Sequence, residues 1–281
     1  MKAAVLAVVL CALSSAAVAK MQYTTPLPAG ARPPLVISSA PPDKKYAGMA
    51  MALVPGTSFI IIQTKGGSIF LGPLLGAANI EAKTKALAKK SVGGYMGADV
   101  PAIASMSLAL LGADAQPKPG AYTVMPYAYV QQCGDDEMYR VALALDVKAP
   151  GDKDAWHGRY VAHLASPIPF AQFLNPSEAQ LTAFNAELAA AADQATRLLE
   201  RDMRGELPED GRLVKFGSLN IIGNKIGGIG IYTAAKDLWL NGVKLIEERD
   251  GNVVVRMKAD PTTFPYGVHI MARSQVHKLE D

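Results

Sequence analysis

The sequence predicts an α+β fold: an antiparallel or mixed sheet with helices on one face, followed by a small β-rich C-terminal region. Helical periodicity falls in stretches that all end before residue 206. Strand-like alternation fills residues 122–168, and short strand-like runs fill the chain after Pro208. Strands and helices that are segregated in this way are typical of a sheet covered on one side.

The first 19 residues have the order of a secretory signal peptide. Lys2 precedes an apolar run that is too short to span a bilayer, and Ala17, Val18 and Ala19 supply small residues at the cleavage point. We therefore expect cleavage between Ala19 and Lys20, and a mature protein that is periplasmic or secreted. The next segment, 20–34, contains four prolines and predicts an extended arm.

Residues 35–205 are expected to form an α/β domain, and residues 206–281 a β-rich C-terminal region. Within the first lies an apolar, glycine-rich segment, 46–80, that has two interpretations. Its uncharged runs approach the length of a membrane span, but Pro55 and Gly56 interrupt the first of them. Burial in protein is therefore favoured over contact with a membrane or a partner. The residues that would make such a contact are Phe59, Ile60, Ile61, Phe70, Leu74 and Leu75.

Two shorter helices are predicted before the central strands. The first begins near Pro73 and ends at Gly93. The second has Asp99 as its N-cap, and its predicted inner face consists of Ile103, Met106 and Leu110. Three strands starting at 122, 139 and 158 then predict an antiparallel meander.

A long helix over residues 176–204 is the strongest local prediction. Asn175 is its expected N-cap, with Pro176 in the first turn and Glu178 completing a capping box. The apolar stripe between Leu181 and Leu198 predicts packing against the sheet. Farther along, Asp250 and Gly251 predict a tight hairpin turn between two strands.

No local motif indicates catalysis or a cofactor. The sequence lacks the dinucleotide-binding and phosphate-binding glycine motifs, the nucleophile elbow and the H-E-x-x-H zinc motif. The spacing of its four histidines, which include His163 and His269, does not match a metal-binding motif. Only one cysteine, Cys133, remains after cleavage of the signal peptide. We therefore expect no catalytic residue, no metal ligand and no cofactor. The formal net charge of +3, without a long basic run, argues against nucleic acid.

The stretch WHGRY is the best candidate binding surface. Trp156, His157, Arg159 and Tyr160 include the residue types in which binding energy concentrates. The alternative, which we favour, is that the aromatic residues only fill the sheet edge.

The sequence as a whole suggests an exported, non-catalytic protein of a bacterial-type cell envelope. The order of strand, helices, three strands and helix is similar to that of small α/β modules of envelope and outer-membrane assembly proteins, an analogy at the level of the fold. The expected role is to bind, or to help assemble, another envelope component, either a protein or a lipid. One alternative is a periplasmic hydrolase whose site forms only in three dimensions, by gathering His163 or His269 with a carboxylate and a hydroxyl. Another is a protein attached peripherally to a membrane through residues 46–80.

Overall fold

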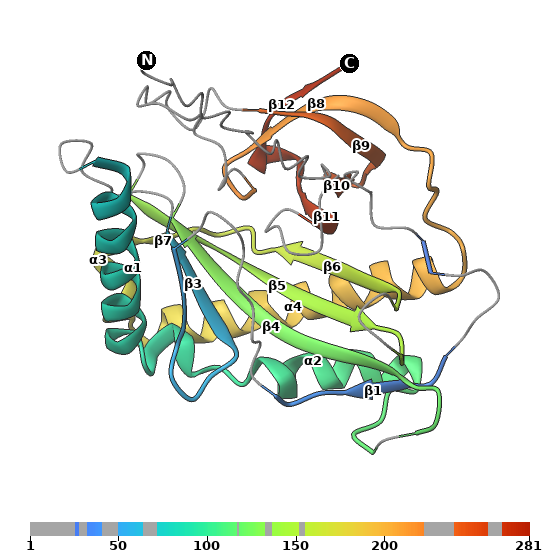
Figure 1. The fold of residues 1–281 in the computed structure, drawn as a ribbon, viewed down its shortest axis with the longest axis horizontal. Helices are drawn as coiled ribbons and strands as arrows, with labels where there is room; N and C mark the ends of the chain where they lie inside the picture. The colour runs from blue at the N-terminus through green and yellow to red at the C-terminus, as the bar shows by residue number, and fades with distance from the viewer. Residues whose placement is uncertain are drawn as a thin grey trace, which may run out of the picture.

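A mixed sheet of twelve strands organises the part of the chain that the structure describes (Figure 1). The structure is a computed structural model, and it describes residues 26–27, 33–40, 50–63, 72–116, 118–132, 137–151, 155–221, 239–257 and 266–281. At residues 72–78 and 132 it describes the backbone only. The predicted signal peptide, Phe70 and Cys133 lie outside these ranges, as do the side chains of Leu74 and Leu75.

Ten strands follow one another across the sheet in the order β12-β8-β9-β10-β11-β6-β5-β4-β3-β2. The strands of the first half are β1 (Leu35–Ile37), β2 (Ala50–Leu53), β3 (Phe59–Gln63), β4 (Tyr122–Gln132), β5 (Met138–Lys148), β6 (His157–His163) and β7 (Ile168–Pro169). Those of the second half are β8 (Arg212–Ser218), β9 (Leu240–Arg249), β10 (Asn252–Met257), β11 (Gly267–Ala272) and β12 (Val276–Glu280). Strand β1 pairs with β4, and β7 pairs with β5, beside the main path.

The predicted meander is present, because β4, β5 and β6 pair in antiparallel order. Parallel pairing occurs where β3 and β1 join β4 and where β11 joins β6. The α+β class, with a mixed sheet, is therefore confirmed. The strands of the C-terminal region, 206–281, continue the same sheet. They nevertheless pack around an apolar cluster of their own, which includes Phe216 and Val255.

The helices pack on one face of this sheet. They are α1 (Gly72–Lys90), α2 (Val100–Leu108), the short α3 (Phe170–Phe173) and α4 (Glu178–Met203). Ala88 of α1, Leu108 of α2 and Leu188 of α4 join one buried cluster with the sheet. Figure 1 shows α2 and α4 behind β4 and β5, so the viewer looks at the opposite face. That face is the one on which the candidate site lies.

The long helix packs as its periodicity predicts, but it begins later. Its buried residues include Phe184, Leu188 and Leu198, which face β5 and β6. The N-cap is Ser177 and not Asn175: the Ser177 Oγ accepts from the Gln180 N–H, and the Gln180 Oε1 accepts from the Ser177 N–H. Ser-x-x-Gln thus forms the capping box two residues beyond the predicted one.

Of the three residues predicted for the inner face of α2, Ile103 packs against the core and the other two do not. Met106 and Leu110 are 66% and 82% exposed, whereas Val100, Ala104 and Leu108 are buried. The apolar residues of this short helix lie on most of its sides, so their periodicity alone could not identify the face that points inward. The N-cap prediction was correct, since the Asp99 carboxylate accepts from the Ala102 N–H. At the hairpin, Asp250 and Gly251 have φ of 52° and 74°, as a tight turn between β9 and β10 requires.

Phe59, Ile60 and Ile61 lie inside the protein. They belong to β3, which pairs with β2 on one side and with β4 on the other, and all three residues are at most 2% exposed. Phe59 and Ile61 face the helices, while Ile60 faces the other side. These three residues therefore do not form an exposed apolar patch.

Candidate functional site

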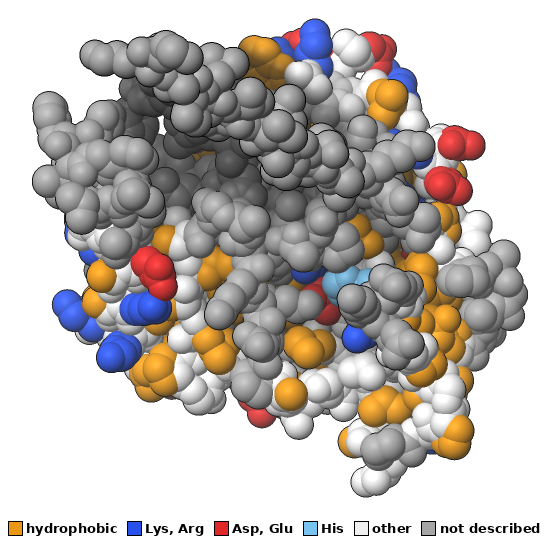
Figure 2. Space-filling view, viewed as in Figure 1, with side chains coloured by type: hydrophobic (Ala, Val, Ile, Leu, Met, Phe, Trp, Pro, Cys, Tyr) orange, Lys and Arg blue, Asp and Glu red, His pale blue; other side chains and the backbone are white. Residues whose placement is uncertain are grey.

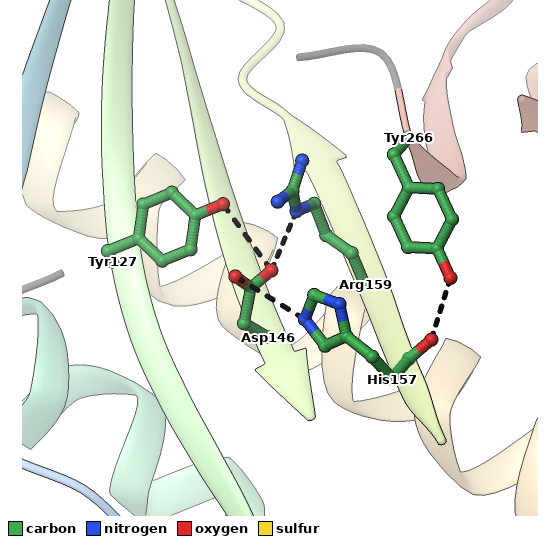
Figure 3. Close-up of polar contacts among 5 residues, drawn as sticks. All are labelled: Tyr127, Asp146, His157, Arg159 and Tyr266. Atoms are coloured by element: carbon green, nitrogen blue, oxygen red, sulfur yellow. Dashed lines mark hydrogen bonds and ion pairs between the residues drawn. The ribbon is translucent and has the colours of Figure 1, made fainter. Parts of the chain in front are cut away.

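Polar side chains from three adjacent strands converge on the sheet face opposite α2 and α4. Tyr127 lies on β4, Asp146 on β5, and both His157 and Arg159 on β6 (Figure 3). Side chains alternate between the faces of a strand, and the register pairs Asp146 with Arg159. Residues separated by up to 32 positions in sequence thus meet in one cluster.

The Asp146 carboxylate is the centre of this cluster. Its Oδ1 accepts a hydrogen bond of 2.6 Å from the Arg159 Nε and one of 3.4 Å from the Tyr127 hydroxyl. Its Oδ2 lies 3.8 Å from the His157 Nε2. The Asp146 and Arg159 side chains are only 4% and 1% exposed, so they form a buried ion pair.

Tyr266, just before β11, closes the cluster on its other side. Its hydroxyl donates a hydrogen bond of 2.7 Å to the His157 carbonyl oxygen, and the two rings stack with centroids 5.8 Å apart. The Arg159 guanidinium carbon lies 5.8 Å from the centre of the Tyr266 ring, which is within the range of a cation–π contact. The C-terminal region therefore helps to build the site.

The cluster reaches solvent at the end of β5. Lys148, the last residue of this strand, is exposed and pairs with Thr123 of β4 and with His157 of β6. The His157 side chain is itself 20% exposed. Figure 2 shows histidine atoms next to acidic and basic ones on this face. The rim thus offers cationic and hydrogen-bonding groups in front of the buried ion pair.

Packing alone does not account for a buried ion pair on this face. Removing both charges from water costs several kcal/mol per ion, and apolar residues of similar volume are often at least as stable. On the same face, the next residues along β5 and β6 are the apolar Ala144 and Val161. A buried ion pair that continues to the surface through polar groups is therefore a candidate functional site.

The four residues of the predicted binding surface divide between the two faces of the sheet. Arg159 and Tyr160 are buried, at 1% and 0% exposure, and are not on the surface. Trp156 is half-buried on the helix side, where its ring packs against Tyr122. The same ring covers Gly158 so closely that a side chain there would collide with it. Only His157 and Arg159 join the cluster.

Tyr160 belongs to a second buried polar cluster, on the helix face. Its hydroxyl donates a hydrogen bond of 2.5 Å to Asp202 near the end of α4, and the same carboxylate accepts the Leu27 N–H at 3.3 Å. Burial raises the pKa of Tyr160 well above its usual value, and the charge of Asp202 raises it further. Burial also raises the pKa of Asp202, although Tyr160 and Arg256 oppose this shift. The cluster joins β6, β10, α4 and the arm at Leu27.

The two histidines proposed for a hydrolase site lie against one another. His163 Nε2 and His269 Nδ1 are 3.1 Å apart, with exposures of 5% and 0%, and the Tyr129 ring packs edge-on against His163. Burial lowers the pKa of His163 well below its usual value, and His269 lowers it further. Among the residues in the structure's described ranges, no group of three or more His, Cys, Asp or Glu could hold a metal ion.

An open cleft elsewhere is a weaker candidate. It lies between the β2–β3 turn and the start of α2, and its lining includes Leu53, Thr57 and Pro101. The one titratable residue in that lining is Asp99, whose carboxylate already caps α2. The cleft therefore has little chemistry to offer a ligand.

Comparisons with known proteins add no candidate function. No family model matches the chain, and neither a curated protein nor a solved structure matches it. Within the described ranges, the helices are either too short or too polar to cross a membrane. The site must be interpreted from its own geometry.

The sequence contained only part of the signal for this site. Asp146 is the one acidic residue in the apolar strand YRVALALDV, and such a residue indicates either a partner or a site. Strand alternation could have separated His157 and Arg159 from Trp156 and Tyr160. Tyr127 and Tyr266 were missed because only the pairing of β4, β5, β6 and β11 brings them together.

Proposed function

We propose that this is an exported protein of the cell envelope that binds another envelope component, without catalysis, through the sheet face opposite α2 and α4. The binding site is the cluster of Tyr127, Asp146, His157 and Arg159 together with the exposed rim at Lys148. The proposal does not use Phe59, Ile60 or Ile61, which are buried.

One observation supports this proposal above the others: a buried Asp146–Arg159 pair that continues outward to accessible basic groups. Arg159 fixes the carboxylate, and Tyr266 fixes His157 at the rim through a hydrogen bond to its carbonyl oxygen and through ring stacking. A preorganised rim of this kind loses little conformational entropy on binding. Lys148 and His157 are suited to polar or acidic groups of a protein or a lipid head group.

The second candidate is a hydrolase that acts at the same place. An imidazole beside a carboxylate is the arrangement that a general base requires, and His157 lies 3.8 Å from Asp146. Tyr266 stacks on His157, but its hydroxyl is bonded to the His157 carbonyl oxygen, so the attacking group would be water. The binding function needs fewer groups than this and is preferred.

Retention of a bound component by the exported protein tests the proposal. Tagged protein is isolated from the periplasmic fraction and from washed membranes, and native mass spectrometry identifies what remains bound. We expect the wild type to retain a component that the Lys148→Glu variant loses. Arg197→Glu, an equal charge reversal at an exposed position of α4, should retain it.

Two outcomes would count against the binding proposal. Equal retention by both charge-reversal variants would remove the rim from the binding surface. Turnover of ester, phosphate, peptide or glycoside substrates that disappears in His157→Gln would favour the hydrolase. Export itself is tested by the mass of the mature N-terminus, which should begin at Lys20.

A further inference from the structure

The C-terminal strands are joined to the rest of the sheet by a short seam. Along the main path of the described sheet, β11 and β6 pair over only three residues each, Val268–Ile270 with Tyr160–Ala162. Every other ladder on that path has at least four pairs. A short ladder with few backbone hydrogen bonds is a place where a sheet can open locally.

The buried histidine pair lies on this seam. His269 is the middle residue of the three on β11, and His163 follows the paired residues of β6. Their rings stack with centroids 5.3 Å apart, and a single hydrogen bond of 3.1 Å joins the two imidazoles. That bond needs one nitrogen with a proton and one without. A doubly protonated pair therefore cannot make this bond, and burial disfavours protonation of His163 in the folded seam.

The surroundings of the pair do not favour a positive charge. Tyr129 of β4 packs on His163 with its ring edge, and the residue opposite His269 on β10 is Val255. On the same sheet face, β5 contributes Arg140, two residues before the partner of His163, and β6 contributes Arg159. Asp146, the acidic residue that β5 and β6 place on this face, is bonded to Arg159.

We propose that this histidine pair makes the β6–β11 seam an acid-sensitive latch, which is closed at neutral pH and opens locally when the pH falls. Opening brings both imidazoles into water, where they take up protons freely. A fully protonated pair cannot re-form its hydrogen bond, because both facing nitrogens would then be donors. Opening also separates Tyr266 from His157, and it thereby disturbs the rim of the candidate binding site.

The direction of the effect follows from proton linkage. Burial lowers the pKa of His163, so the closed state binds fewer protons than the open state below the ordinary histidine pKa of about 6.5. Closure is therefore fully stable above that pH and weakens as the pH falls below it. For one histidine that is protonated only in the open state, the opening constant increases about 100-fold between pH 7.5 and pH 4.5.

Hydrogen exchange of the wild-type protein tests the latch directly. Exchange is measured by mass spectrometry between pH 7.5 and 4.5 and is corrected for the intrinsic dependence on pH. We expect protection in β6 and β11 to fall at least tenfold, while protection in the β4–β5 ladder stays nearly constant. Equal losses in both regions, or constant protection of β11, would overturn the proposal.

Glutamine variants connect the effect to the pair. His163→Gln and His269→Gln should each remove most of the pH effect, whereas His277→Gln, at an exposed position of β12, should leave it unchanged. The latch would be contradicted if His163→Gln and His269→Gln both lost protection on acidification as much as the wild type does. Should either variant fail to fold, NMR titration of the four wild-type histidines decides. His163 should remain neutral in the folded state at pH 5.5, and protonation of its imidazole by that pH would contradict the latch.

Discussion

Removal of Arg159 is the perturbation that most directly examines the buried cluster. In Arg159→Met, the Asp146 carboxylate loses its 2.6 Å charge-assisted hydrogen bond. Its contacts to Tyr127 and His157, at 3.4 and 3.8 Å, are too long to replace it. Because the Asp146 side chain is 4% exposed, water cannot solvate it without local opening. We therefore expect the free energy of unfolding to fall by about 3–5 kcal/mol.

The half-buried but solvent-accessible pair of Arg201 and Glu247 provides a matched control. Two hydrogen bonds of 2.6 and 2.9 Å join these side chains, but both are about 30% exposed. Arg201→Met should therefore cost no more than about 1 kcal/mol. Replacing both members of the buried pair, in Asp146→Leu with Arg159→Met, should recover most of the stability that the single variant loses.

Urea unfolding at pH 7, followed by circular dichroism, measures these free energies. The slopes with denaturant should agree among the variants, so that the midpoints report stability alone. Equal losses in Arg159→Met and Arg201→Met would refute the reasoning, because they would mean that water reaches the Asp146–Arg159 pair. A double variant less stable than Arg159→Met would refute it as well.

Three further substitutions test particular parts of the fold in the same assay. Ser177→Ala should lower the free energy of unfolding by about 1 kcal/mol and Asn175→Ala by much less, because Ser177 is the N-cap of α4. A larger loss in Asn175→Ala would mean that Asn175, the N-cap predicted from sequence, is the N-cap after all. Leu188→Ala should cost about 2–5 kcal/mol, since this side chain is fully buried against the sheet, and a loss below 1 kcal/mol would mean that α4 packs differently. Gly267→Ala should cost about 2 kcal/mol or more, because φ is 125° and the new Cβ would lie 2.6 Å from the Arg159 carbonyl oxygen; a neutral result would contradict this close approach of β11 to β6.

Local patterns predicted the elements of this fold better than their assembly. The strand from Tyr122, the long helix and the turn at Asp250 all follow from short-range signals: alternation, an apolar stripe and an Asp-Gly pair. The parallel pairing of β11 with β6 joins residues more than 100 positions apart, and no local signal specifies it. That pairing unites the C-terminal strands with the rest of the sheet.

The candidate site was predictable only in part for the same reason. Composition drew attention to His157 and Arg159, but it grouped them with Trp156 and Tyr160, which face the other side of the sheet. The partner of Arg159 is Asp146, on the preceding strand, and only the strand register identifies it. The histidine pair was missed because His163 and His269 lie on strands far apart in sequence.

Site-specific photo-cross-linking in cells tests most directly whether the proposed face binds another envelope component. A photoreactive residue is placed at Lys148, beside the cluster, or at Arg197, on the exposed side of α4. If the sheet face opposite α2 and α4 binds that component, irradiation should give a discrete adduct from position 148 and none from position 197. An adduct from position 197 alone would contradict the account and place the binding surface on the helices.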